Sequence, residues 1–309
     1  MCFSALKGTA MNFSWRKGAC VFTRMHLNRP INTLRVLTLN LWQRYGSWAD
    51  RRSLLVDRIR PAGADLIGFA ESIKTKDYDQ TSDLLGPEFI VVQSKARDAS
   101  GMGISIASRW PVLEVQELDL NVSARAAGFP SSTLAAEIDA PAPIGPFLFV
   151  NHFPNWQLNM EYERELQAVT TARFLEERIR RKPHHIVMVG DLDADPEAAS
   201  IRFWSGRQSL HGVSVCYRDA WASKHPNEPG HTFTPENPLV NEQVVKGMRP
   251  FRDWPFRRID YIFLRLGPHG GSALDITACE RIFDGPVNGI WASDHFGLIA
   301  DFALDPLPS

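Results

Sequence analysis

Four polar side chains each follow a short apolar run of the chain. Asn40 follows 36–39, Glu71 follows 66–70, His152 follows 147–151 and Asp191 follows 186–190. Such a strand end suits the floor of a pocket, because the rigid backbone fixes the side chain while its tip reaches solvent. Each ending alone is an ordinary turn signal or a surface residue. Together, the four predict one site with metal-binding and acid-base groups.

Two further blocks near the C-terminus carry the same residue types. Asp260 stands in Arg258-Ile259-Asp260-Tyr261, and Asp294 and His295 come just before the last apolar run. An Asp-His pair there could simply cap a strand. With a second histidine and three more acids elsewhere, it indicates a site instead.

The elements that must position these residues are mainly short β-rich runs. We expect strands at 34–40, 65–70, 89–93, 103–108, 133–138, 146–151, 185–190, 259–264 and 296–302, and helices at 49–60 and 161–180. Strands outnumber helices and several are hairpin-spaced, which argues against a purely parallel sheet. The pattern favours two packed mixed sheets with helices outside.

In this order, the blocks resemble the endonuclease/exonuclease/phosphatase superfamily, the metal-dependent group that includes deoxyribonuclease-I-like nucleases and neutral sphingomyelinases. The resemblance runs from about residue 34 to 302. It rests on six blocks: Leu37-Thr38-Leu39-Asn40, Ala70-Glu71, Asn151-His152, Gly190-Asp191-Leu192-Asp193, Arg258-Ile259-Asp260-Tyr261 and Ser293-Asp294-His295. It implies a deoxyribonuclease-I-like α/β fold, a four-layer sandwich of two mixed β-sheets flanked by helices.

The resemblance also implies a metal site. A phosphoester carries negative charge that repels a nucleophile, so a hard cation must neutralise it. By resemblance, Glu71 is the principal metal carboxylate, with Asn40 and Asp294 on the ion or on its waters. These oxygen ligands suit Mg²⁺, Mn²⁺ or Ca²⁺ and not a structural zinc, and we expect one or two Mg²⁺ or Mn²⁺ ions.

The remaining blocks correspond to the family's acid-base groups. Asp191 and a His295–Asp260 pair would activate the attacking water, and their division of labour stays open. His152 resembles the second histidine, which binds the phosphoryl oxygens or protonates the leaving group. Its alternative is a buried structural histidine.

Asp193 is the main departure from the family pattern. The family commonly has Asn two residues after the aspartate, where its amide donates to the phosphoryl group, and a carboxylate cannot donate unless protonated. Asp193 could instead recruit a second metal ion, hold His152 or His295, or turn away from the pocket. A smaller departure is Asn151, where Thr is usual.

Substrate-binding candidates lie in the long irregular stretch 224–257 and at its end. His231 and Asn237 occupy the place of a substrate-contacting loop, and Arg258 and Tyr261 flank Asp260. The segment 246–258 interleaves cations with aromatic side chains: Lys246, Arg249, Phe251, Arg252, Trp254, Phe256, Arg257 and Arg258. This composition fits phosphate and base binding, and equally a loop that packs its aromatics on the domain.

The bulk composition limits the partners. The chain has 309 residues with 34 basic against 35 acidic groups and a net charge of −1, so it is not built to coat nucleic acid or an anionic membrane. Its four cysteines are scattered, which predicts reduced thiols. We expect residues 1–32 to form an atypical or disordered leader and 33–309 to form one domain, with no transmembrane segment, no obligate protein partner and a cytoplasmic location.

These features predict a metal-dependent hydrolase of phosphoester bonds, either a phosphodiesterase or a phosphatase. The sequence leaves nucleic acid, phospholipid and small phosphorylated metabolites open as substrates. One alternative is a nuclease that uses the segment 246–258. A second is a catalytically silent binding protein of the same fold, for which Asp193 would be the first sign of lost activity.

Overall fold

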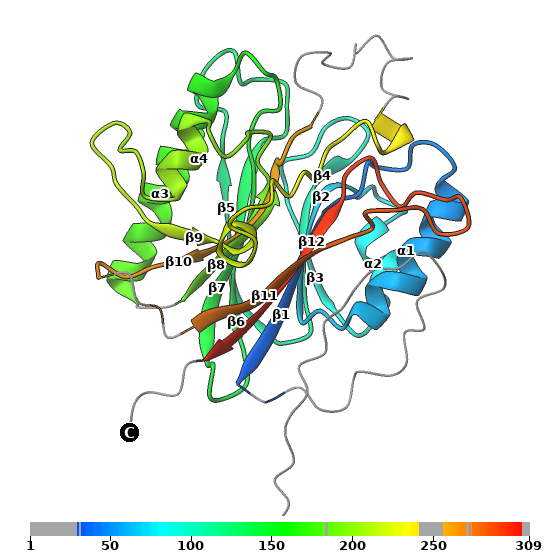
Figure 1. Ribbon diagram of the computed structural model, residues 1–309, viewed down its shortest axis with the longest axis horizontal. Coiled ribbons are helices and arrows are strands. Elements are labelled where there is room, and N and C mark those ends of the chain that lie inside the picture. The colour runs from blue at the N-terminus through cyan, green and yellow to red at the C-terminus, as the bar shows by residue number, and fades with distance from the viewer. Residues whose placement is uncertain are drawn as a thin grey trace, which may run out of the picture.

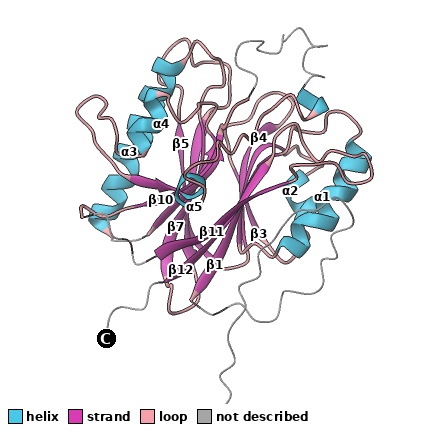
Figure 2. Ribbon diagram, in the orientation of Figure 1, coloured by secondary structure: helices cyan, strands magenta, loops and turns pink. Residues whose placement is uncertain are grey.

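The computed structural model describes residues 30, 32–182, 185–240, 256–269, 272 and 274–304. These residues form two six-stranded sheets packed face to face, with helices on the outer faces (Figures 1 and 2). The expected leader, apart from Pro30 and Asn32, and residues 241–255 of the irregular stretch lie outside the described residues.

The first sheet has the strand order β11-β12-β1-β2-β4-β3. Its strands are β1 (Thr33–Asn40), β2 (Leu66–Ile73), β3 (Ile90–Gln93), β4 (Met102–Ser108), β11 (Leu274–Ile282) and β12 (Gly297–Leu304). β1 and β2 are parallel and joined through helix α1 (Trp48–Ala62), whereas the other neighbours are antiparallel. The sheet is therefore mixed, as expected.

The second sheet repeats this plan with the order β5-β6-β7-β8-β10-β9. Its strands are β5 (Val112–Asp119), β6 (Ser132–Asp139), β7 (Pro146–Phe153), β8 (Ile186–Asp191), β9 (Tyr217–Asp219) and β10 (Asp260–Arg265). β7 and β8 are the parallel pair, and helix α3 (Glu161–Arg181) connects them. In each sheet the carboxyl ends of the parallel pair therefore lie at one edge.

Apolar side chains pack between neighbouring layers in three cores. The central core lies between the sheets and includes Val36 and Phe149. A second core packs Phe69 against α1 and α2 (Gln80–Leu85), and a third packs Val150 against α3 and α4 (Ala199–Trp204). Two sheets with a helical layer on each outer face form the four-layer sandwich that the sequence predicted.

The observed elements extend and supplement the expected ones. β2 and β7 continue past the predicted ends, so Glu71 and His152 lie inside strands and not after them. The sequence patterns did not predict β5, β9, β11, α2, α4 or α5 (Ala220–Lys224). β5 has exposed apolar side chains, and β9 and the short helices have too few residues to show a period. In β11, a register shift between Ile276 and Ala278 interrupts the alternation.

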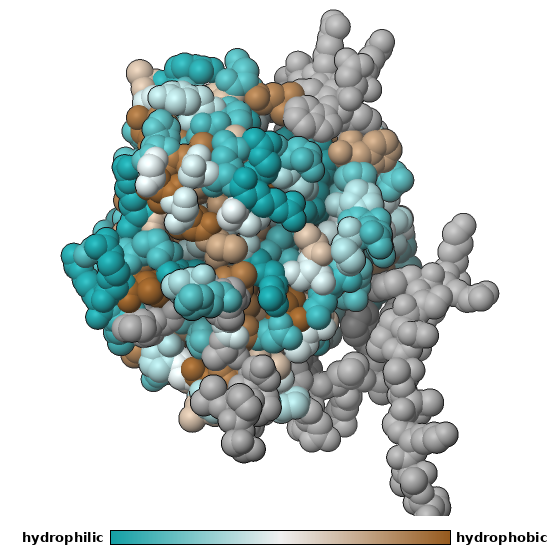
Figure 3. Space-filling model, turned by 60° about the vertical axis from the view of Figure 1, so that its left-hand side comes forward, coloured by the Kyte–Doolittle hydropathy of each residue, from teal (hydrophilic) through white to brown (hydrophobic). Residues whose placement is uncertain are grey.

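The surface is mostly polar on the face shown in Figure 3, where hydrophobic residues occur as scattered patches. Within the part of the chain that is described, we find no helix with the length and hydrophobicity of a membrane span. Of the cysteines in that part, Cys216 is exposed and Cys279 is buried, and both are free thiols.

Candidate active site

The period of two along the strands explains why three site residues meet. On β1, β8 and β10, the inward-facing side chains Val36, Val189 and Ile262 belong to the central core. Counting by twos along each strand places Asn40, Asp191 and Asp260 on the same inner face, at the site end of their strands. The strands therefore direct an amide and two carboxylates into the layer between the sheets.

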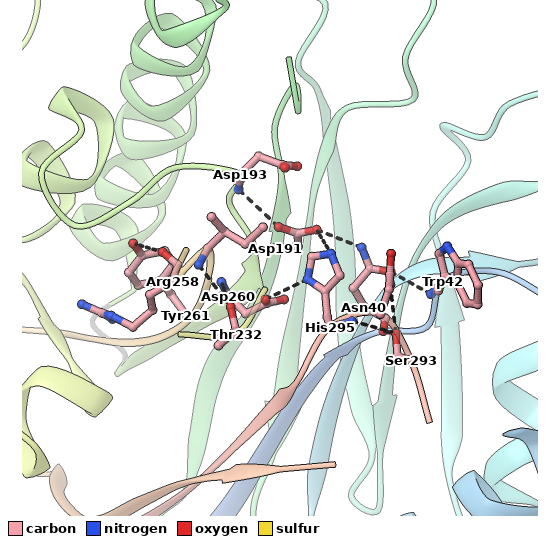
Figure 4. A network of polar contacts seen from close by, with 12 residues as sticks. Asn40, Trp42, Asp191, Asp193, Thr232, Arg258, Asp260, Tyr261, Ser293 and His295 are labelled. Atoms are coloured by element: carbon pink, nitrogen blue, oxygen red, sulfur yellow. Dashed lines mark hydrogen bonds and ion pairs between the residues drawn. The ribbon is translucent and has the colours of Figure 1, made fainter. Parts of the chain in front are cut away.

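Asn40 links the two sheets by its side-chain amide (Figure 4). Its Nδ2 donates to Asp191 Oδ2 at 2.9 Å and to Glu71 Oε1 at 3.2 Å, and its Oδ1 accepts from the backbone N–H of Trp42 at 2.8 Å. An amide nitrogen has no lone pair for a cation. In this geometry Asn40 presents a donor that spaces two carboxylates, and its expected place on the ion or on its waters stays a prediction.

Glu71 reaches the site through a β-bulge. The pairing of β2 with β4 shifts register between Phe69 and Ser72, and Glu71 adopts a left-handed φ of 51°. The regular alternation would point Glu71 outward like Phe69, whereas the extra residue turns it toward the site. Gln43 Nε2 donates to Glu71 Oε2 at 3.2 Å, so each carboxylate oxygen has an amide donor.

His295 and Asp260 form a buried pair. Nδ1 of His295 lies 2.9 Å from Asp260 Oδ2, and its Nε2 lies 3.9 Å from Asp191 Oδ2. The backbone N–H of Asp260 donates to Thr232 Oγ1 at 3.2 Å. Oδ1 of Asp260 is buried and has no hydrogen-bond partner among the described residues. The predicted pairing of His295 with Asp260 is thus present, with Asp191 on the other side of the ring.

The charges in this cluster change the pKa values of His295 and Asp191. Burial lowers the pKa of His295, but the facing charges of Asp260 and Asp191 outweigh it and hold that pKa well above its ordinary value. Burial and the charge of Asp193 raise the pKa of Asp191 well above its ordinary value. So much negative charge in one buried place favours protons or cations between the carboxylates.

The donor set fits a hard divalent cation. Glu71 and Asp294 offer carboxylate oxygens, and Ser293 Oγ, which lies 2.7 Å from the Asn40 carbonyl, is 3.2 Å from Asp294 Oδ1. A second group of possible ligands, Asp191, Asp260 and His295, has one ligand atom each within 4.8 Å of the others. In that group Nδ1 of His295 is already bonded to Asp260, whereas Glu71 offers two carboxylate oxygens, the ligand type that a hard cation prefers.

His152 lies on the outer face of its sheet. It alternates with inward-facing Asn151, and its ring packs edge-on against Trp204 with centroids 5.8 Å apart. Nδ1 lies 2.8 Å from Thr133 Oγ1 and 3.4 Å from Thr171 Oγ1. Burial lowers the pKa of His152 to about 3. The structure therefore keeps this imidazole neutral and does not bring it into the hydrogen-bonded cluster around Asp191.

Asp193 lies beside the cluster in a left-handed conformation with a φ of 51°. Its backbone N–H is 3.2 Å from Asp191 Oδ1, and its carbonyl accepts from Arg257 Nη2 at 2.8 Å. Burial raises the pKa of Asp193 to about 6 despite the attraction of Arg257 and Arg164. Among the described residues, no hydrogen bond joins its carboxylate to His152 or His295, which leaves the second-metal and turned-away alternatives.

Three of the four predicted substrate-binding residues have structural partners. Arg258 is buried, and its Nη1 bonds Asp219 Oδ2 at 2.6 Å. The hydroxyl of Tyr261 is 2.8 Å from the carbonyls of Ala194 and Arg258. Buried Asn237 donates from Nδ2 to the Ser293 carbonyl at 2.7 Å. These contacts hold the three side chains within the fold, although Nε of Arg258 is buried without a hydrogen-bond partner among the described residues, and their contact with substrate stays a prediction.

His231 is the fourth of these candidates and remains partly exposed. Its ring faces that of Phe256 with centroids 5.5 Å apart, and its carbonyl accepts from Arg281 Nη1 at 3.0 Å. Burial, and then the charge of Arg281, lowers the pKa of His231. A neutral ring at the surface keeps substrate contact available for His231.

Several supporting residues were not predicted from the sequence. Gln43 holds Glu71, and Thr232 accepts the N–H groups of Ile259 and Asp260. Gln167 is buried, and its side-chain oxygen and nitrogen both bind Asn155. Amide and hydroxyl residues of this kind give no distinct sequence signal, because their roles depend on contacts across the fold.

The comparisons with known proteins agree with this fold. The model of the endonuclease/exonuclease/phosphatase family matches residues 37–295, which span every block from Asn40 to His295. The chain therefore belongs to the endonuclease/exonuclease/phosphatase family.

The individual relatives named here have low sequence identity to this chain. Sphingomyelin phosphodiesterase 2 of Homo sapiens is 27% identical over 292 residues, covering 86% of this chain and 64% of that protein. Among solved structures, the human Nocturnin catalytic domain with bound sulfate has a TM-score of 0.66 at 15% identity, covering 88% of this chain and 93% of that one. D. rerio TDP2 with a single-strand DNA product has a TM-score of 0.65 at 18% identity, covering 87% and 98%. These structures share the fold.

Proposed function

We propose that this chain is a Mg²⁺- or Mn²⁺-dependent phosphodiesterase that hydrolyses its substrate by attack of water on phosphorus. The observation that carries the proposal is the buried chain of contacts from Glu71 through Asn40 and Asp191 to His295 and Asp260. It places carboxylates that fit a hard cation next to a polarised His-Asp pair. When bound, the cation supplies charge neutralisation at the phosphoryl oxygens.

The protein's own residues supply the proton transfer. We assign the acceptance of the water's proton to Asp191, because Asn40 Nδ2 and the N–H of Asp193 fix both of its oxygens. His295 faces Asp191 through Nε2, while Asp260 holds the opposite ring nitrogen. Asp260 thereby orients the imidazole and stabilises its protonated form, which favours negative charge on the reacting phosphoryl group.

In this proposal His152 takes no part in the proton transfer. Its pKa of about 3 makes it a poor carrier of a proton for the leaving group near neutral pH. With Thr133 bound at Nδ1, the proton resides on Nε2 when the threonine hydroxyl donates. Because the ring packs against Trp204 outside the hydrogen-bonded cluster around Asp191, we assign His152 to the support of its strand and not to contact with the phosphoryl group.

For the substrate we propose a phospholipid diester of the sphingomyelin type over a nucleic acid. The relative named sphingomyelin phosphodiesterase 2 matches 86% of the chain. The overall charge of −1 gives little of the phosphate neutralisation that non-specific nucleic-acid binding needs. In addition, Arg257 and Arg258 from the basic segment 246–258 are buried and paired with Asp195 and Asp219. Fewer of its cations are then left for a nucleic-acid backbone.

The direct test is hydrolysis by the purified full chain with Mg²⁺, with Mn²⁺ and with EDTA. We would assay sphingomyelin in detergent micelles, bis-p-nitrophenyl phosphate, p-nitrophenyl phosphate, plasmid DNA and single-stranded RNA in parallel. The proposal expects metal-dependent release of phosphocholine from sphingomyelin, with slower turnover of the generic diester. Cleavage of DNA or RNA but not of sphingomyelin would favour the nuclease, and inactivity on all substrates would favour the silent binding protein.

A further inference from the structure

The backbone at Glu71 needs support from its surroundings. Glu71 is a non-glycine residue at a φ of 51°, a conformation that costs on the order of 1–3 kcal/mol. The neighbouring loop holds its strand from one side, since the N–H groups of Leu41 and Gln43 donate to the carbonyls of Ala70 and Glu71 at 2.9 and 3.2 Å. These two bonds hold β2 only along its edge toward β1. We therefore expect a second contact to hold the bulge where β2 pairs with β4.

The second support comes from the opposite sheet. Asn151 on β7 is fully buried and points into the layer between the sheets. Its Nδ2 donates to the carbonyl of Phe69 at 3.0 Å and to the carbonyl of Ser105 at 2.9 Å. Phe69 and Ser105 are the last pair of the β2–β4 ladder before its register shifts. One amide group thus bridges both strands at the start of the bulge.

We infer that Asn151 is a positioning residue that fixes Glu71 from the opposite sheet, and that the affinity of the cation site depends on it. The inference rests on the proposed metal-dependent function. It also gives a physical role to the position where the family usually has Thr. A threonine hydroxyl carries one proton and can donate to only one of the two carbonyls, whereas an amide supplies two.

The packing around Asn151 leaves little room for another arrangement. A Cβ on Gly68, the residue before Phe69, would meet Val189 Cγ2 at 2.4 Å and Asn151 Nδ2 at 3.3 Å. The sheets therefore approach closely at this point. If the amide is lost, two carbonyls lose a donor in a buried place, and the strand can relieve this by relaxing the bulge.

The first experiment needs no metal. Hydrogen exchange followed by mass spectrometry would compare wild type with N151T and N151S, both metal-free. We expect exchange in 40–44 and 70–73 to become at least about tenfold faster, with little change in β11 and β12. L148A, on the same strand but facing α3, is the control for a general loss of stability. Equal protection of 40–44 and 70–73 in wild type and either folded Asn151 variant would overturn the inference.

The second experiment measures Mn²⁺ binding to the same proteins by calorimetry. Changes in residues that orient metal ligands typically cost 10–100-fold in affinity, so we expect the Kd of N151T and N151S to rise by about tenfold or more, with L148A close to wild type. Unchanged affinity in a folded Asn151 variant would refute the inference and leave the proposed function standing. If wild type itself binds no Mn²⁺, both the metal-dependent function and the inference fail.

Discussion

The amide nitrogen of Asn40 lies 2.9 Å from Asp191 Oδ2, and this contact joins the ends of β1 and β8 across the two sheets. The same nitrogen is 3.2 Å from Glu71 Oε1. The two carboxylates thus share one neutral donor. Because the contact depends on both sheets, the site forms only when the sandwich is complete.

Replacing this donor by a carboxylate tests its role. In N40D a third acid would face Glu71 and Asp191 without a proton to share, so we expect kcat/KM for the diester to fall by about 10²-fold or more. The measurement is steady-state turnover with Mg²⁺. N121D makes the same chemical change at an exposed loop position and should retain wild-type turnover. Similar activity in the two variants would contradict the role given to Asn40.

The Asp260 carboxylate should be needed for its charge and not only for its shape. D260N keeps the size of the side chain but removes the charge that holds a proton on His295, and we expect kcat to fall by about 10²-fold or more with a small change in KM. Separate kcat and KM values would test this, with the exposed D139N as control. A loss confined to KM would instead point to substrate binding.

The buried neutral His152 predicts a pH-dependent stability. Its pKa is lowered to about 3 in the folded protein, so as pH falls below about 6.5 only the unfolded chain takes up the proton. Stability is therefore lost as pH falls from about 6.5 toward the folded value.

Between pH 7.5 and pH 5.5, wild type should lose about 1.4 kcal/mol more than H152Q. Urea unfolding of both proteins at the two pH values measures the difference. Equal losses would mean that His152 is protonated in the folded protein.

The close approach of the sheets at Gly68 predicts a packing penalty. The Cβ of G68A would lie 2.4 Å from Val189 Cγ2, which forces the two sheets to adjust. We expect the free energy of unfolding to fall by about 1–3 kcal/mol. G285A, where a Cβ meets nothing within 4 Å, should change stability by less than about 0.5 kcal/mol. Equal effects in urea unfolding would show that the sheets tolerate the added methyl group.

The sequence predicted the sandwich well because both of its parallel pairs show long apolar runs. β1, β2, β7 and β8 are buried on both faces, and each carries its polar residue at or near the carboxyl end. β5 was missed because it is an edge strand with exposed Leu113 and Val115, so its alternation does not mark a buried face. The number of strands is therefore harder to predict than the class of fold.

Within the site, residue types were easier to predict than orientations. The His295–Asp260 pair follows from family order, and the structure shows it. The bulge at Glu71 and the outward-facing ring of His152 depend on how two strands pair, which a linear pattern does not record. For the same reason the sequence did not show that Arg258 and Tyr261 have structural partners. Their partners, Asp219 and Ala194, lie far away in the sequence.

The most direct test of the account is metal-dependent hydrolysis by wild type and D191N. We would measure phosphocholine release from sphingomyelin micelles across a Mg²⁺ titration, after confirming by circular dichroism that both proteins are folded. We expect turnover in wild type that EDTA abolishes and Mg²⁺ restores, and a loss of about 10³-fold in D191N. Metal-independent turnover, or equal turnover in the two proteins, would contradict a phosphodiesterase site built on Asp191.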